Sequence, residues 1–153
     1  MNDTRVDVDM PTSSKILCTV YAVIVLAALI ATLSQNLAYA HSLADLTTFI
    51  GSFVTDTKVN PASRSITADI LLFFLAAAIF MVIEARKHDV KFVWAYLIGG
   101  GLIAISVTFP LFLIARERRT CRTDPTRLTA TDTAVLALFA VGIAALVIWV
   151  DVV

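Results

Sequence analysis

Two carboxylates interrupt the long apolar runs of this 153-residue sequence, and each could do chemistry. Asp69 lies inside the apolar run from Ile66 to Ile83, and Glu84 directly follows that run. Ionisable groups inside a membrane span are energetically unfavourable, so each one suggests a function such as proton or cation binding. On one helix the two side chains would be about 22 Å apart along the axis, with about 60° between their directions. This separation excludes a single active site that uses both carboxylates.

Asp69 would have several polar residues near it if the chain crosses a membrane four times. The end of the first span, the start of the second and the end of the third would then share one membrane face. Asn36, Asn60, Arg64 and Arg116 would join Asp69 there in a polar intramembrane site for a cation, a proton or a polar headgroup. The alternative is structural, with Asp69 pairing with Arg64 or Arg116. The sequence favours this alternative, because a buried carboxylate needs a partner whether or not it has a function.

Other catalytic and metal-binding patterns are not evident in the sequence. His41 and His88 fall on different sides of the predicted membrane, and Cys18 and Cys121 lack the spacing of metal ligands. We find no phosphate-binding glycine loop, no catalytic triad and no basic-aromatic surface for nucleic acid. The sequence therefore predicts no metal, no cofactor and no nucleic-acid partner, and it falls short of what naming an enzyme requires.

The composition indicates the elements that must position these residues. Hydrophobic residues make up 59% of the chain and charged residues 16%, with a formal net charge of +0. Soluble domains average about 45–50% apolar and about 25% charged residues. Because the apolar residues form blocks long enough to cross a bilayer, we expect an all-α integral membrane protein. The predicted elements are four transmembrane helices and a short interfacial amphipathic helix, near residues 16–37, 62–86, 92–115, 131–151 and 42–55 respectively.

The domain organisation follows from these blocks. Residues 1–15 are predicted to be a solvated N-terminal tail, and residues 16–153 a single transmembrane domain. Ala38-Tyr39-Ala40 resembles a signal-peptide cleavage site, but the preceding apolar block is long and its leader is acidic, so we expect no cleavage.

Local signals refine the helix ends and contacts. Asn60-Pro61 predicts a helix start, with Asn60 as the N-cap, and Thr131-Asp132 predicts the start of the last span. Pro110 is expected to kink the third span, because it cannot donate to the carbonyl of Ser106. Small residues at Gly99, Gly100, Gly101 and Ala104 predict close helix–helix packing, and a flexible hinge is the alternative.

The orientation follows from the distribution of lysine and arginine over the predicted loops. Four spans put five of these residues on the side of both termini and seven on the other side. The positive-inside rule then predicts that the 116–129 loop is cytoplasmic and that both termini are outside.

Part of the chain resembles a known family. The motifs are Asn-Pro-Ala-Ser-Arg-Ser at 60–65, Asp69, Glu-Ala-Arg-Lys at 84–87, Trp94, Phe-Pro-Leu-Phe-Leu at 109–113 and Arg116-Glu117. Over residues 16–118 this pattern is similar to a family of small bacterial membrane proteins described as a domain of unknown function. The resemblance implies about three hydrophobic spans, so the span at 131–151 is additional to the family pattern, and it implies no activity.

The sequence supports one function more than another. We expect a small multi-pass membrane protein that has no catalytic activity. Its location would be the cell membrane, which in a bacterium is the inner membrane. It would have the lipid bilayer as its surroundings, and would assemble with itself or serve as an accessory subunit of a larger membrane complex. The alternative is a membrane-embedded carrier or catalyst for a lipophilic, isoprenoid-like substrate, with Asp69 as the working acid.

Overall fold

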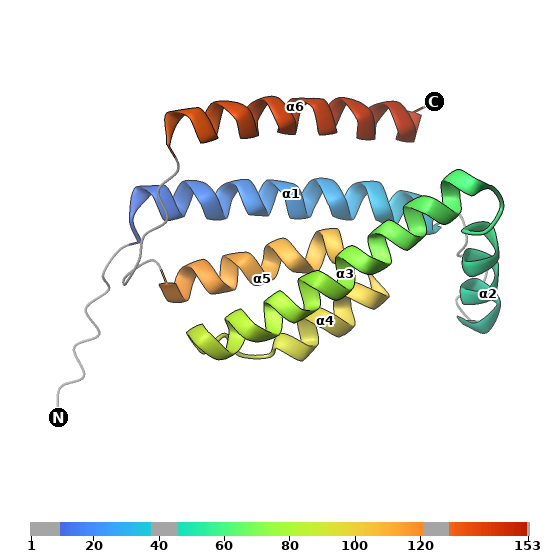
Figure 1. Cartoon of the computed structure of the whole chain (residues 1–153), viewed down its shortest axis with the longest axis horizontal. Helices are drawn as coiled ribbons and strands as arrows, with labels where there is room; N and C mark the ends of the chain where they lie inside the picture. The colour runs from blue at the N-terminus through green and yellow to red at the C-terminus, as the bar shows by residue number, and fades with distance from the viewer. Residues whose placement is uncertain (1–9, 38–45, 121–128, 153) are drawn as a thin grey trace.

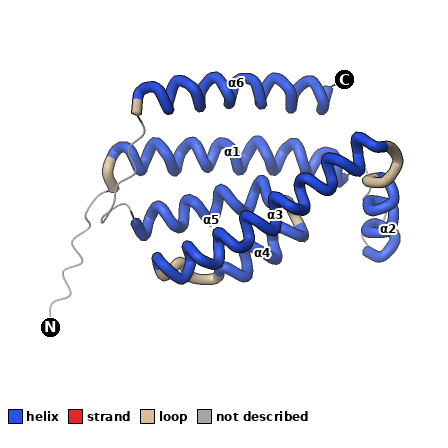
Figure 2. Tube along the Cα trace, in the orientation of Figure 1, coloured by secondary structure: helices blue, strands red, loops and turns tan. Residues whose placement is uncertain are grey.

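The computed structural model describes residues 10–37, 46–120 and 129–152, and helices are the regular structure throughout this part of the chain (Figure 2). The described residues form six helices in the order α1 (Thr12–Leu37), α2 (Leu46–Asp56), α3 (Pro61–His88), α4 (Val93–Leu102), α5 (Ile105–Thr120) and α6 (Ala130–Val152). Within the part of the chain that the structure describes, three stretches are long and apolar enough to cross a membrane, namely Thr12–Leu37, Pro61–His88 and Ala130–Val150. Their bounds agree within a few residues with three of the four predicted spans.

The prediction of one continuous helix for the third span is wrong, because residues 92–115 are divided between two helices. The chain turns at Ile103 and Ala104, and α5 runs back along α4 as the second arm of a helical hairpin (Figure 1). The antiparallel arrangement is visible in the side chains, since the rings of Tyr96 and Phe112 pack edge to face with centroids 5.8 Å apart. The 10 residues of α4 extend about 15 Å, half of the roughly 30 Å of a hydrocarbon core.

The physical reason for the turn lies in three consecutive glycines that precede it. Glycine is about 1 kcal/mol less favourable than alanine in a helix interior, so the end of α4 is a weak point for a continuous helix. Pro110 lies inside α5 and not at the break. The Ala104 carbonyl accepts hydrogen bonds from the backbone N–H groups of Val107 and Thr108, each at 3.2 Å, and so begins α5.

Helix starts at two other positions have local causes. The Asn60 side chain accepts a hydrogen bond from the Ser63 N–H at 2.8 Å, and Pro61 is the first residue of α3, which confirms the predicted start. At α6 the N-cap is Thr129, because its hydroxyl accepts from the Asp132 N–H while the Asp132 carboxylate accepts from the Thr129 N–H. This reciprocal capping box includes Asp132 of the predicted Thr131-Asp132 start, and the N-cap lies two residues before that pair.

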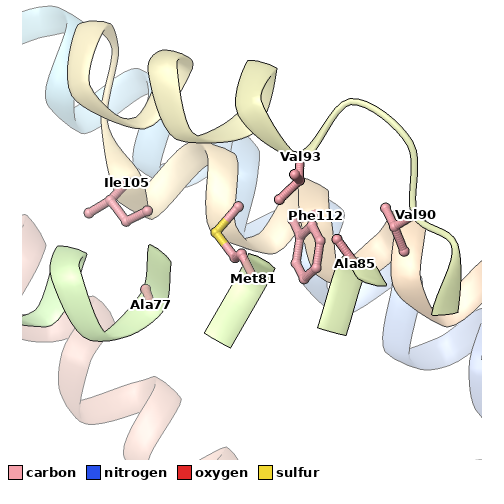
Figure 3. Close-up of a cluster of buried hydrophobic side chains, with 7 residues drawn as sticks. All are labelled: Ala77, Met81, Ala85, Val90, Val93, Ile105 and Phe112. Carbon is pink, nitrogen blue, oxygen red and sulfur yellow. The ribbon is translucent and has the colours of Figure 1, made fainter. Parts of the chain in front are cut away.

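The hydrophobic core lies between α3 and the hairpin. Met81 and Phe112 are fully buried at its centre, and residues from α3, the turn after it, α4 and α5 converge around them (Figure 3). Phe109 of α5 extends the contact by packing edge to face against Phe73 and Phe80 of α3. The helix α1 packs along α5, with its least exposed residues recurring every three or four positions.

Among the residues that the structure describes, helices α2 and α6 contribute none to the hydrophobic core. Helix α2 covers most of the predicted 42–55 helix and runs across the direction of α1 (Figure 1), while residues 42–45 lie outside the described part of the chain. Helix α6 is drawn apart from the other helices, and its side chains from 130 to 150 are exposed all round. The expected solvated tail ends earlier than predicted, because α1 already begins at Thr12 and buries Ser14 completely.

Candidate functional site

The hairpin brings one end of α1, α3 and α5 together, and a group of buried and half-buried polar side chains lies there. We call Ser14, Glu84, His88, Arg116 and Glu117 the polar cluster. The starting end of α1 supplies Ser14, the last turns of α3 supply Glu84 and His88, and α5 supplies Arg116 and Glu117. Glu117 is 2% exposed and Glu84 8%, which is unusual for carboxylates unless they are paired.

Consecutive residues of α5 reach two different neighbours. The Arg116 Nε group donates a hydrogen bond to Glu84 Oε2 of α3. The Ser14 hydroxyl of α1 donates a hydrogen bond to Glu117 Oε1 at 2.6 Å. Adjacent residues on a helix point about 100° apart, so α5 uses one residue for each neighbour. The polar cluster therefore joins the three helices at a single level.

His88 adds a second contact to Glu84. Its Nε2 atom lies 3.3 Å from Glu84 Oε2, one helical turn away, but the geometry is not that of a hydrogen bond. The Nε2 atom is nevertheless buried within the described part of the chain. Protonated His88 would give Glu84 a second positive neighbour beside Arg116.

The chemistry open to the polar cluster is pairing of charges. Glu84 already accepts a hydrogen bond from Arg116, and Glu117 accepts one from Ser14, so each carboxylate has a partner. Among the residues that the structure describes, no group of three histidine, cysteine, aspartate or glutamate side chains could hold a metal ion. The arrangement is better suited to holding α1, α3 and α5 together than to catalysing a reaction.

The hairpin separates Arg116 from the other members of the predicted polar intramembrane site. Arg116 lies against Glu84, which is 15 residues, or about 22 Å along the helix, from Asp69. Arg116 was predicted to lie beside Asp69 because residues 92–115 were expected to form one transmembrane helix. Since the hairpin returns the chain to its starting end, Arg116 comes back to the end of α3.

The other predicted members remain at the opposite end of the molecule. Asp69 and Arg64 are exposed on the first half of α3, and Asn36 is half-buried near the end of α1. Asn60 is occupied as the N-cap of α3. Within the described ranges, no hydrogen bond or ion pair is formed by the Asp69 side chain. It lies one turn before Phe73, on the face of α3 that continues through Phe80 to Glu84.

The small residues predicted for helix packing differ in their surroundings. A Cβ atom added to Gly100 would lie 2.9 Å from Thr108 Oγ1, and one added to Gly99 would lie 3.2 Å from Thr108 Cγ2. A Cβ atom at Gly101 would meet only a Phe74 ring atom, at 4.0 Å. Ala104 lies in the turn. Gly99 and Gly100 therefore mark a close approach of the two hairpin arms.

Comparison with known protein families covers most of the residues just described. The family model for the protein of unknown function DUF2834 matches residues 20–118. The chain belongs to the DUF2834 family. The region matched to DUF2834 contains α3, the hairpin and most of α1, and it includes Glu84, Arg116 and Glu117 of the polar cluster. Ser14 and α6 lie outside the part matched to DUF2834. No curated protein and no solved structure matches the chain.

Sequence reasoning missed most of the polar cluster. It took Glu84 as an isolated residue at the far membrane surface, His88 as a lone histidine, and Ser14 as part of a solvated tail. A usable signal was present in the Arg116-Glu117 pair, since two opposite charges ending an apolar helix can pair with two neighbours. Using that signal requires knowing that Glu84 and Arg116 lie at the same end, which only the turn at Ile103 and Ala104 decides.

Proposed function

We propose that this chain is a multi-pass membrane protein that assembles with copies of itself and has no catalytic activity. In this proposal α1, α3 and α6 span the bilayer, and the α4–α5 hairpin enters and leaves through the same face. Helix α2 lies along the opposite face, which fits its direction across α1 (Figure 1). The membrane is the cell membrane, in a bacterium the inner membrane.

The observation that carries the proposal is the isolation of α6. Its side chains from 130 to 150 are exposed all round, and it is drawn apart from the rest of the bundle (Figure 1). The other helices contact one another through the core around Met81 and Phe112 and through the polar cluster, and α1 packs along α5. A spanning helix that its own bundle leaves free is well suited to contact another copy.

A stripe of small side chains on α6 supports a helix partner. Thr133, Ala137, Ala140 and Ala144 follow one another at spacings of 4, 3 and 4 residues, which places them on one face. In membranes, helix association depends on close backbone approach, and small residues at this spacing permit it. Bulky residues such as Leu138 and Leu146 occupy other faces of α6 and suit contact with lipid tails.

Disulfide crosslinking in native membranes tests self-assembly directly. Cys18 and Cys121 are first replaced by serine, and single cysteines are then introduced on α6. We expect Ala137→Cys and Ala144→Cys to give crosslinked dimers under mild oxidation. Leu138→Cys and Leu146→Cys are the matched controls on other faces and should remain monomeric. Absence of homodimers at every α6 position, with the protein correctly inserted, would contradict self-assembly.

One observation favours a second candidate function. Asp69 is exposed within the apolar run of α3, and within the described ranges it forms no ion pair. An intramembrane carboxylate of this kind could serve a carrier or catalyst that acts on a lipophilic, isoprenoid-like substrate. Purification in mild detergent followed by lipid analysis separates the candidates. Recovery of stoichiometric copies or partner proteins supports the assembly function, whereas a retained lipophilic small molecule that is lost in Asp69→Asn supports the carrier.

A further inference from the structure

The turn between α3 and α4 holds an aromatic side chain in an unusual position. Phe92 has φ 62° and ψ 32°, the left-handed conformation that bulky residues rarely adopt. Val90 and Val93 on either side of it are buried in the core (Figure 3), and Phe92 is 80% exposed. The turn thus directs an apolar ring away from the protein. Trp94, two residues later, is 59% exposed.

Three exposed cations lie within eight residues of these rings in the sequence. Arg86 and Lys87 are exposed in the last turn of α3, and Lys91 is exposed in the turn itself. The acidic residue of the turn, Asp89, lies 3.9 Å from Arg119 of α5, so it already has a cationic neighbour. We call Arg86, Lys87, Lys91, Phe92 and Trp94 the turn patch.

The turn patch belongs to a strongly basic end of the molecule. Because the hairpin returns α5 to the end where α1 begins and α3 stops, their charges collect there. Of the lysine and arginine residues in the described ranges, two lie at the opposite end, Lys58 and Arg64. Seven lie at this end, namely Lys15, Arg86, Lys87, Lys91, Arg116, Arg118 and Arg119.

We propose that the turn patch is a binding surface for the headgroups of anionic phospholipids. This inference rests on the membrane placement proposed above, but not on self-assembly through α6. The cations attract phosphate groups, and clusters of lysine and arginine next to a membrane span favour anionic lipids. The exposed aromatic rings suit the boundary between headgroups and acyl chains, where aromatic residues are enriched. A protein or nucleic-acid partner would explain the cations, but it would not explain two exposed rings at the level where α4 enters the membrane.

The sequence offers a built-in probe of this surface. The chain has two tryptophans, Trp94 in the turn patch and Trp149 near the C-terminal end of α6. A Trp149→Phe variant therefore reports fluorescence from Trp94 alone. The protein is reconstituted into phosphatidylcholine vesicles that contain a minority of brominated lipid, either phosphatidylglycerol or phosphatidylcholine. Bromine close to the headgroup quenches a tryptophan that contacts that lipid.

We expect brominated phosphatidylglycerol to quench Trp94 more than brominated phosphatidylcholine does, with a relative affinity on the order of fivefold. The preference should decline as salt is raised, because the Debye length falls from about 10 Å at 0.1 M to about 3 Å at 1 M. The triple variant Arg86→Gln, Lys87→Gln, Lys91→Gln should bring the affinity ratio close to one. Lys91→Gln alone should lower the ratio, whereas Lys58→Gln, the same substitution at the opposite end, should leave it unchanged.

Trp149 supplies the control for membrane insertion. In a Trp94→Phe variant, both brominated lipids should quench Trp149 to the same degree. Loss of that quenching would mean that the protein is not placed as proposed, which is a failure of the proposed function. Normal Trp149 quenching combined with equal quenching of Trp94 by both lipids would overturn the headgroup proposal alone. A triple variant of normal helicity that retains the phosphatidylglycerol preference would overturn it as well.

Discussion

The buried charges of this protein act through pairs that join separate helices. Arg116 neutralises Glu84 across the contact of α5 with α3, while Ser14 gives Glu117 a hydrogen bond from α1. A buried ion pair is not necessarily more favourable than two apolar residues, because both ions lose their hydration. Removal of one partner is always unfavourable, since it leaves the other charge unpaired. The polar cluster therefore specifies which helix ends meet more than it adds net stability.

We predict that Arg116→Gln destabilises the protein and that a second substitution restores part of the loss. Breaking a buried pair from one side reduces stability by about 3–5 kcal/mol, and access to water at this end brings the effect toward the lower value. The double variant Glu84→Gln, Arg116→Gln should be more stable than Arg116→Gln alone. Thermal unfolding in detergent measures the cycle, and the exposed Arg119→Gln is the control with little expected change. Additive losses in the double variant would contradict the pairing.

Asp69 leads to the opposite expectation. Within the described ranges no cation compensates its charge, so a neutral side chain should suit the apolar run better. We predict that Asp69→Asn has a melting temperature equal to or above that of the wild type across pH 5 to 8. Glu84→Gln, the matched change at the other end of α3, should lower the melting temperature. A clear loss of stability in Asp69→Asn would instead support the structural ion pair with Arg64 that the sequence favours.

At the scale of elements, features set by neighbouring residues could be predicted from the sequence, whereas the path of the chain between helices could not. The N-cap at Asn60, the bounds of α3 and α6 and the end of α1 could be predicted, because caps and apolar length depend on neighbouring residues. The hairpin could not be predicted in the same way. An apolar run of 23 residues, 93–115, has the length of a span, and hydropathy does not say whether the chain turns within it. The misplacement of Arg116 in the candidate site followed from that one turn.

We predict that the hairpin tolerates a methyl group at one glycine and not at the next. In Gly100→Ala the new Cβ atom would lie 2.9 Å from Thr108 Oγ1 and 3.2 Å from Phe74 Cε2, so these side chains or the helices that carry them must shift. Overpacking of this kind costs about 1–3 kcal/mol. In Gly101→Ala the nearest atom is 4.0 Å away, and the better helix propensity of alanine should leave stability unchanged or higher. Thermal unfolding compares the two, and equal effects would contradict the close approach at Gly100.

At the scale of the whole molecule, the hairpin changes how the chain would cross the membrane in the proposed placement. With three spans, the start of α1 and the start of α6 fall on one face, and the turn before α3 falls on the other. With four spans, the start of α6 would share a face with the turn before α3. The hairpin also makes the distribution of charge more one-sided, since seven of the nine described lysine and arginine residues lie at one end. The positive-inside rule then assigns that end to the cytoplasm, and the N-terminal end of α1 with it.

Cysteine labelling decides between the two threadings. In a variant with Cys18→Ser and Cys121→Ser, single cysteines replace Met10 before α1, Lys58 before α3 and Ala130 at the start of α6. We predict that Lys58→Cys reacts with a membrane-impermeant reagent in intact cells, whereas Met10→Cys and Ala130→Cys react only after permeabilisation. Ala130 is the informative position, because the hairpin places it with Met10 and a continuous third span would place it with Lys58. Labelling of Ala130→Cys together with Lys58→Cys would therefore show that residues 93–120 cross the membrane. If Met10→Cys and Ala130→Cys both react from outside and Lys58→Cys does not, the hairpin stands and the orientation is reversed.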